Sequence, residues 1–394
     1  MEKYYIWLLL AFGESSPEIS ELIKRFGTAE NVYKSFEKNV SLAGMQNISR
    51  AEKIPLSKAQ TLCDSIANSG VSIITWESPD YPAHLRRTAS PPCALFAQGD
   101  TSLLHKKLIT VVGSRKVTPY TEYALPQILE RLGGEYAIVS SLSEGCDQLT
   151  CLNAMRSGIP FIEVMPCGFS QTYPAGSKSL RSFLLSNGGL LISEYMPKTH
   201  TGQGSFRRRS RIIGGISYVT LVLQAGENSG ALATAEYSYA PLFLPPNNIF
   251  AKEYAGAVNA VRGGAKLYLS EKSIENAFAS AMKKENSGSE VKKEAFRKNS
   301  KRSASAPQNQ KQGSDTEHEK EQPAENTAKL PGREAFESDE QYTVYSFIAG
   351  SLSPVSSEEI ISGTGLPAET VSEVLLDLEM SDMLSGSGNR YSPA

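Results

Sequence analysis

The chain has 394 residues and a formal net charge of only −2, with 40 Lys or Arg against 42 Asp or Glu. That length allows two or three domains with a sizeable core. The even charge balance excludes a polybasic protein, so any nucleic-acid site must be a local patch. Five cysteines, four histidines and no Cys-x-x-Cys pair argue against a disulfide framework and against zinc. We therefore expect reduced, mostly buried thiols, no metal and no cofactor.

Residues 1–75 predict a small helical module. Apolar residues recur at helical spacing in three groups: Trp7, Leu8, Leu10; Ile19, Leu22, Ile23, Phe26; and Leu62, Ile66. Gly27 and Gly70 follow as helix stops. The opening apolar run, 4–12, is too short for a membrane span and lacks a cleavage site, so we expect a cytoplasmic protein without a membrane partner. A connector, 76–105, follows with two proline-containing turns.

Residues 106–270 predict an α/β core. Short apolar runs alternate with helical segments, and the strand candidates are 108–112, 137–139, 161–164, 190–192 and 219–223. Several are apolar on both faces, which is typical of a parallel sheet covered by helices on each side. Thr118 followed by Pro119 specifies a helix start after the first of these strands. The expected fold is a Rossmann-like, doubly wound, mostly parallel sheet.

In such sheets, ligands bind beyond the carboxyl ends of the strands. The segment Gly113-Ser114-Arg115 directly follows the first strand candidate, so its backbone N–H groups can face a phosphate. The alternative for Arg115 is an ion pair with a carboxylate at a strand end. Segments 141–147, 167–174 and 225–229 follow other strand candidates and are expected at the same edge.

A second basic segment begins at Phe206. Four arginines lie within the next five positions: Arg207, Arg208, Arg209 and Arg211. Guanidinium groups suit phosphate, and clustered like charge is relieved by a bound polyanion. The alternative is a solvated helix face. Phe206 would either stack on an unpaired base or pack as a hydrophobic staple ahead of the helix.

Three further residues are weaker candidates. Ser229-Gly230 opens a helix after a strand, where it would bind an anion, cap the helix, or do both. Lys178, after Tyr173-Pro174, is a candidate contact to a DNA backbone. An acidic set is better explained by loop capping and arginine pairing than by catalysis: Glu144, Asp147 and Glu194. We expect no catalytic residues.

The C-terminal third predicts a linker and a second small domain. Residues 271–341 are polar and poor in large apolar side chains, as in a disordered linker, with a basic first half that could add weak phosphate contacts. Residues 342–394 show two helices and a hairpin, which is winged-helix architecture. The second helix carries four acidic residues and neither Lys nor Arg: Glu369, Glu373, Asp377 and Glu379. That face would repel phosphate, so a protein-contact role is favoured.

In this order the motifs resemble those of the DNA-processing protein A family (DprA, also called Smf). The resemblance rests on 112–115, 141–147, Ser193-Glu194-Tyr195, Gly168 with Tyr173-Pro174, 206–217 and 229–235. It covers nearly the whole length and implies an N-terminal module of the SAM or helix-hairpin-helix kind, a Rossmann-like core and a winged helix. The chain departs from the pattern at Arg207, Ser210, Cys151, Leu142 and Leu244-Pro245-Pro246.

The resemblance implies a non-enzymatic protein that binds single-stranded DNA, forms homodimers and loads a RecA-type recombinase during DNA processing and natural transformation. Carried over by position, the DNA pocket would contain Gly113, Ser114, Arg115, Phe206, Arg208, Arg209 and Arg211. Two alternatives stay open. One is a nucleotide-binding enzyme similar to nucleoside-monophosphate phosphoribohydrolases, of which 228–236 is a loose analogue. The other is a scaffold that acts through residues 342–394.

Overall fold

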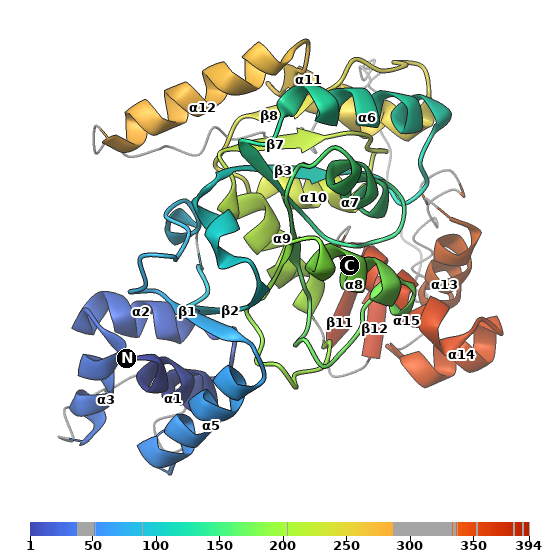
Figure 1. Ribbon diagram of the computed structural model, residues 1–394. Coiled ribbons are helices and arrows are strands. Elements are labelled where there is room, and N and C mark those ends of the chain that lie inside the picture. The colour runs from blue at the N-terminus through green and yellow to red at the C-terminus, as the bar shows by residue number, and fades with distance from the viewer. Residues whose placement is uncertain are drawn as a thin grey trace, which may run out of the picture.

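The computed structural model describes residues 1–37, 51, 53–88, 90–202, 204–286, 333, 336, 338–351, 354–380, 383–387 and 390–393. At the centre of this part of the chain lies a nine-stranded sheet of order β1-β2-β6-β5-β4-β3-β7-β8-β9 (Figure 1). From β6 to β9 the strands run parallel, and β2 and β1 add antiparallel at one edge. The strands are β1 (Ser72–Thr75), β2 (Ala94–Gly99), β3 (Lys107–Val112), β4 (Tyr136–Ser140), β5 (Phe161–Val164), β6 (Leu190–Ser193), β7 (Val219–Val222), β8 (Leu242–Leu244) and β9 (Lys266–Leu267).

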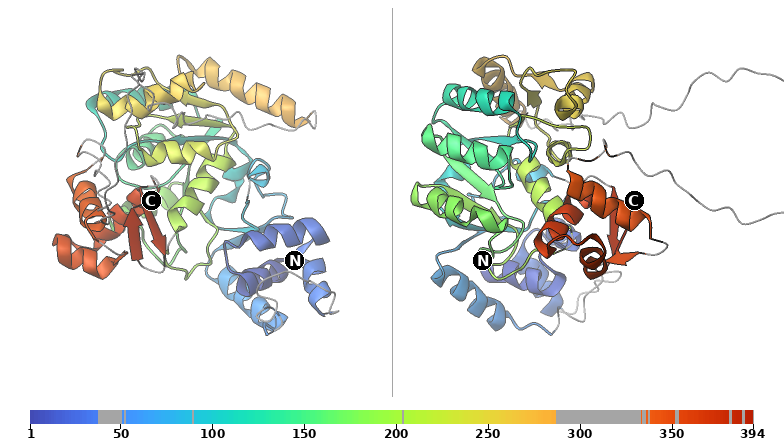
Figure 2. Two further views of the ribbon diagram at one scale, coloured as in Figure 1. Left: turned by 180° about the vertical axis from the view of Figure 1, so that it is seen from behind. Right: turned by 90° about the vertical axis from the view of Figure 1, so that its right-hand side faces the viewer.

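Helices cover both faces of this sheet, so the predicted doubly wound architecture is confirmed (Figures 1 and 2). One face packs against α6 (Pro119–Leu132), α7 (Cys146–Arg156), α8 (Lys178–Ser186) and α12 (Glu271–Asn286). The other packs against α9 (Ser205–Ile216), α10 (Gly230–Glu236) and α11 (Ala255–Arg262). The strand order reverses between β3 and β7, which is the switch point where such folds bind ligands.

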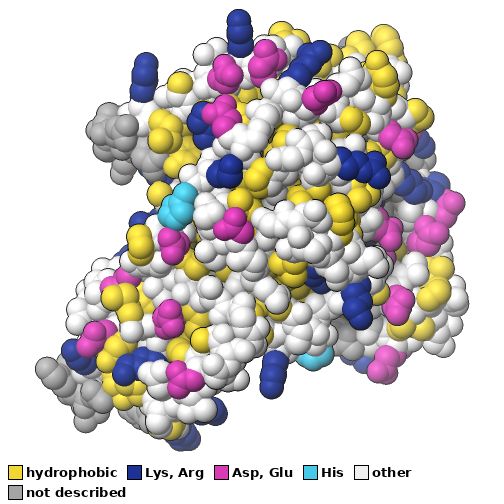
Figure 3. Space-filling model, in the orientation of Figure 1, with side chains coloured by type: hydrophobic (Ala, Val, Ile, Leu, Met, Phe, Trp, Pro, Cys, Tyr) yellow, Lys and Arg dark blue, Asp and Glu magenta, His cyan; other side chains and the backbone are white. Residues whose placement is uncertain are grey.

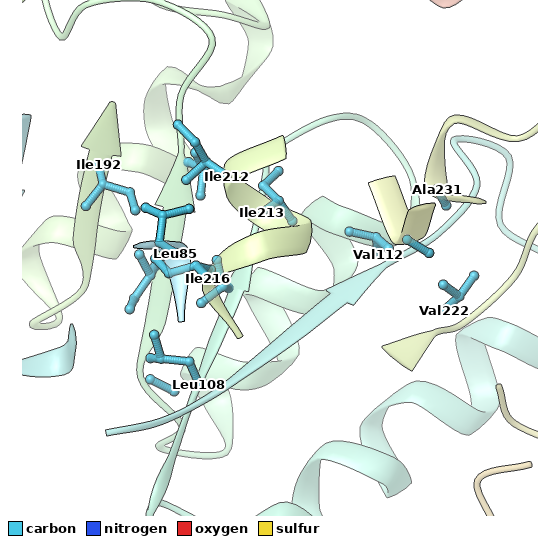
Figure 4. Close-up of a cluster of buried hydrophobic side chains, with 14 of the residues drawn as sticks. Leu85, Leu108, Val112, Ile192, Ile212, Ile213, Ile216, Val222 and Ala231 are labelled. Carbon is cyan, nitrogen blue, oxygen red and sulfur yellow. The ribbon is translucent and has the colours of Figure 1, made fainter. Parts of the chain in front are cut away.

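The central strand shows why both layers form. Leu108 and Val112 of β3 point to the α9 side, whereas Ile109 and Val111 point to the α6 side. Because side chains alternate along a strand, a continuous apolar run supplies two cores at once. Figure 4 shows the α9 side, where Leu108 and Val112 lie near the apolar residues of α9.

The N-terminal module packs against the antiparallel edge. Its helices are α1 (Glu2–Phe12), α2 (Pro17–Phe26), α3 (Ala29–Glu37) and α5 (Leu56–Asn68). The helical spacing predicted α1, α2 and α5, and α3 is an addition. They share a core with Ile73 of β1 and Phe96 of β2. The region 76–105, expected as a connector, therefore contributes β2 to the main sheet, where it pairs with β1 and β6. Strand β1 likewise belongs to the sheet rather than to a purely helical unit.

The prediction that a disordered linker begins at residue 271 is wrong for its first sixteen residues, which form α12. Ile274, Ala277 and Phe278 are buried against the sheet. Their spacing of three and four residues gives a short polar helix one apolar stripe, which is enough to dock it. Most of the remaining predicted linker lies outside the described residues.

The winged-helix prediction is confirmed. The domain contains α13 (Asp339–Ala349), α14 (Ser357–Thr364) and α15 (Ala368–Met380), with strands β10 (Val355–Ser356), β11 (Leu384–Ser387) and β12 (Arg390–Pro393) forming a three-stranded sheet. Ser356 and Glu359 cap α14 reciprocally. The domain lies beside the α9 side of the core, and α15 contacts α9 and α10 (Figure 2).

Two expectations from composition can also be compared with the structure. All five cysteines are buried free thiols. Among the described helices, none combines the length and the apolar character needed to cross a bilayer.

Candidate nucleic-acid interface

A cavity of about 60 Å³ lies at the switch point between β3 and β7. Loops that follow β3, β4 and β7 form its walls together with one side of α9. The lining includes most of the predicted site: Gly113, Ser114, Arg115, Arg209, Ser229 and Gly230, with Asp147 of the acidic set. These loops lie at the edge of the sheet where the sequence predicted a ligand site.

The loop after β3 is held by its neighbours on both sides. A Cβ atom on Gly113 would lie 2.6 Å from the side chain of Cys146, so only glycine allows this close approach. The backbone N–H of Ser114 donates to the carbonyl oxygen of Gln224, after β7, at 3.0 Å. The Gln224 side chain accepts from the N–H of Thr118 and donates to the carbonyl of Lys116. These bonds present Arg115 from a rigid loop.

Asp147 forms the acidic part of the cavity wall. Its Oδ2 accepts a hydrogen bond from Ser141 Oγ at 2.5 Å, and its Oδ1 accepts from the N–H of Gly113 at 3.3 Å. Burial raises the pKa of Asp147 to about 6, although these bonds and the nearby guanidinium of Arg209 favour the charged form. Asp147 thus orders two loops, which is the loop-capping role expected from sequence.

Arg209 is the deepest cation of the site. It is 6% exposed, its guanidinium lies over the ring of Phe206 at 5.1 Å, and its Nη2 is 3.4 Å from Ser143 Oγ. Its Nε is buried without a hydrogen-bond partner among the described residues. Burial lowers the pKa of Arg209, and the Asp147 carboxylate opposes that shift. A buried guanidinium with an unused donor in a cavity wall is suited to an anion.

The four arginines of the basic segment do not act as one patch. Arg207 and Arg208 are exposed, and Arg208 Nη1 is 3.4 Å from the hydroxyl of Tyr195. Arg211 lies on another side of α9, where its Nη2 pairs with Glu194 at 2.6 Å beside the N-terminal module. The expectation that Arg211 lines the same pocket as Arg115 and Arg209 is therefore wrong for this structure.

Phe206 is placed differently from the stacking hypothesis. The side chain is 1% exposed and packs edge-on against Tyr173, with ring centroids 4.7 Å apart. Its faces are covered by protein, so the hydrophobic-packing alternative is the one the structure favours. The ring instead supports the guanidinium of Arg209.

The weaker candidates separate into two groups. Ser229 caps α10 by accepting from the N–H of Ala231, and both Ser229 and Gly230 line the cavity. Lys178 is exposed at the start of α8 and is not part of the cavity lining. The described residues contain no group of three His, Cys, Asp or Glu arranged to hold a metal ion.

Sequence reasoning missed one part of the site. Gln341, Asp377 and Met383 of the winged-helix domain also line the cavity. Asp377 Oδ1 lies 2.7 Å from Arg115 Nη2, so the carboxylate alternative considered for Arg115 is realised by a residue far along the chain. The available signal was the helix with four acidic residues and no basic ones, which favoured a protein contact.

On the face shown in Figure 3, Lys and Arg side chains are interspersed with Asp and Glu. This agrees with the even charge of the whole chain.

Comparisons with known proteins agree with this architecture. A family model described as DNA recombination-mediator protein A matches residues 72–279, and a model of the DprA winged helix domain matches 321–386. The DNA processing protein DprA of Bacillus subtilis is 30% identical over 210 residues, which cover 52% of this chain and 70% of that protein. DprA of Streptococcus pneumoniae is also 30% identical, over 197 residues that cover 49% of this chain and 70% of the relative. Protein Smf of Escherichia coli is 34% identical over 164 residues, 41% of this chain and 44% of that protein.

A solved structure supports the fold independently. The crystal structure of Streptococcus pneumoniae DprA superposes with a TM-score of 0.60 at 23% identity, covering 70% of this chain and 98% of that one. Since the first family model spans more than half of the sequence, the chain belongs to the DNA recombination-mediator protein A family.

Proposed function

We propose that this chain binds single-stranded DNA in the cavity at the switch point and mediates loading of a RecA-type recombinase onto that strand. The observation that carries the proposal is the convergence of Arg115 and Arg209 on one cavity beside the loop Gly113–Arg115. Two guanidinium groups and a glycine-containing loop offer both charged and backbone donors, which is the chemistry that a phosphodiester requires.

The depth of the site favours a single strand over a duplex. Arg209 lines the cavity although its side chain is largely buried, and its Nε has no hydrogen-bond partner among the described residues. A flexible single strand can bend one phosphate into such a recess, whereas a duplex holds its phosphates on a stiff cylinder. Because the ring of Phe206 is covered, we assign sequence-tolerant binding mainly to backbone contacts.

Recombinase loading, a role in natural transformation and homodimer formation belong to the same proposal. They rest on membership of a family of recombination mediators and on relatives named DNA processing proteins. The nucleotide-hydrolase alternative gains little from the geometry. The glutamate of its loosely matching segment falls on Glu236, at the far end of α10 and outside the cavity lining.

Fluorescence anisotropy of labelled oligo-dT and of a matched duplex, across a salt series, tests this function. We expect tighter binding to the single strand, and Arg115→Ala should weaken it about tenfold. The same variant should reduce the slope of log affinity against log salt by about 0.7, the value for one lost phosphate contact on a single strand.

Arg25→Ala is the matched control, because Arg25 is exposed on α2 in the N-terminal module. It should leave affinity and salt slope unchanged. A preference for duplex, or equal losses in Arg115→Ala and Arg25→Ala, would overturn the proposal. Release of free base from a nucleoside monophosphate, measured on the same protein, would favour the enzyme alternative.

A further inference from the structure

The winged-helix domain occupies the mouth of the candidate DNA site. Asp377 of α15 pairs with Arg115 at 2.7 Å, and its other carboxylate oxygen accepts from Gln341 Nε2 of α13 at 3.3 Å. The carboxylate is thus fixed within its own domain and aimed at a core arginine. Both side chains of the ion pair are largely covered, with 29% of Arg115 and 17% of Asp377 exposed.

Other contacts extend the same interface. Arg207 Nη2 donates to the carbonyl oxygen of Glu379 at 3.1 Å. Burial raises the pKa of Glu373, one turn before Asp377 on α15, and the nearby Arg115 cation opposes that shift. Two arginines of the predicted DNA site therefore face acceptor groups of one acidic helix.

These contacts use the donors that a phosphodiester would use. A carboxylate and a phosphate group compete for the same guanidinium N–H groups of Arg115, since each is an anion with two oxygens that the planar guanidinium fork can bind. The volume left behind α15 is about 60 Å³. Ligand pockets are commonly of about 300 Å³ or more, so a nucleotide does not fit while α15 is docked.

We propose that the winged-helix domain is an intramolecular inhibitor of this site, in which the acidic face of α15 stands in for DNA phosphates. The inference rests on the proposed DNA-binding function of the cavity. Single-stranded DNA and docked α15 exclude each other, so binding requires α15 to leave. The affinity observed for DNA is then reduced by the fraction of molecules in which the domain is docked.

The docked state is poised to be reversible. Burial raises the pKa of Asp377 even though Arg115 favours its charged form. Removing this carboxylate from water therefore opposes the stabilisation that its ion pair provides. A DNA strand that offers several phosphates can displace an interface of this kind.

The test uses the full-length chain, with Asp377→Asn and, separately, Glu373→Gln. Both changes remove one negative charge while keeping side-chain size. We expect Asp377→Asn to raise affinity for oligo-dT by about fivefold, because it removes one partly exposed ion pair that holds α15 in the docked state. Glu358→Gln is the control, because Glu358 is an exposed acid of α14 in the same domain.

Hydrogen exchange supplies a second readout that does not depend on affinity. Adding oligo-dT to the wild-type chain should increase amide exchange in 368–380, because α15 leaves the core. Exchange in α15 that stays constant on DNA binding, or equal affinity in wild type, Asp377→Asn and Glu358→Gln, would show that the domain does not inhibit.

A double variant distinguishes an absence of inhibition by α15 from an absence of DNA binding in the cavity. In the Asp377→Asn background, Arg115→Ala isolates the DNA contact from the α15 contact. If Arg115→Ala still weakens binding there while Asp377→Asn alone changes nothing, only the inhibition is refuted. If no variant binds oligo-dT at all, the DNA site and its inhibition are both refuted.

Discussion

Gly145 lies so close to Arg115 that a Cβ atom at position 145 would be 2.0 Å from the Arg115 carbonyl oxygen. Gly145 has φ 79° and ψ −126°, a conformation that other residues rarely adopt. Directly after it, the N–H of Cys146 donates to the carbonyl of Ser114 at 3.0 Å. The start of α7 therefore supports the loop that presents Arg115 to the cavity.

Gly145→Ala should consequently damage the site without removing any charge. Both the positive φ and the contact with Arg115 oppose an added methyl group, so we expect a loss of about 1–3 kcal/mol in the free energy of unfolding. We also expect weaker oligo-dT binding, because Arg115 must move. Gly176→Ala is the matched control, since a Cβ there meets nothing within 4 Å and φ is not positive. Thermal unfolding and anisotropy of both variants check this, and equal behaviour would contradict it.

The pKa of about 6 for Asp147 predicts pH-dependent binding. Below pH 6 the carboxyl is neutral and no longer offsets the positive charges of the nearby Arg209 and Arg115, so oligo-dT should bind more tightly. Above pH 6 the carboxylate repels phosphate and affinity should fall. Asp147→Asn is uncharged at every pH, and its affinity should not show this transition. Anisotropy between pH 5 and 8 at constant ionic strength measures the difference.

The titration of Asp147 also affects the free energy of unfolding, and thermodynamic linkage fixes the direction of that effect. The folded-state pKa of Asp147 is raised above its ordinary value of 3.8, so the native state binds more protons than the unfolded state between about pH 4 and 6. The contribution of Asp147 to stability is therefore fully present below pH 4 and is lost as pH rises through 6. The free energies of unfolding of wild type and Asp147→Asn, measured by denaturation over this range, should become similar at low pH. A difference between them that grows at low pH would contradict the raised pKa of Asp147.

The sequence identified the core strands because their signal is local. Runs such as 108–112 are apolar on both faces, and only a sheet covered on both sides buries both. Strands β1 and β2 were missed because they pair antiparallel, outside the βα repeat. Their place in the sheet depends on partners far away in sequence.

The site was predicted in part for a similar reason. Gly113–Arg115 follows a strand directly, so its position at the carboxyl edge is dictated by topology. The sequence did not show which arginines of α9 face the cavity. Residues two apart on a helix differ by about 200° in direction, so neighbouring arginines point to different sides. Arg209 thus faces the cavity while Arg211 faces Glu194. The docking of Asp377 on Arg115 joins two domains, and the acidic composition of α15 favoured a protein contact without specifying its partner.

Helix α12 belongs to the core of the protein rather than to a linker. Phe278 is 3% exposed and packs its ring against Tyr136 and Tyr218, at centroid distances of 5.3 and 5.7 Å. Phe278→Ala should lower the free energy of unfolding by about 3–5 kcal/mol, because it removes apolar contacts and leaves a cavity. Met282 lies one turn later on the same helix and is 47% exposed. Met282→Ala should therefore change stability by less than about 0.5 kcal/mol. Urea denaturation of the full-length chain distinguishes the two variants, and a small effect of Phe278→Ala would mean that α12 contributes nothing to the stability of the core.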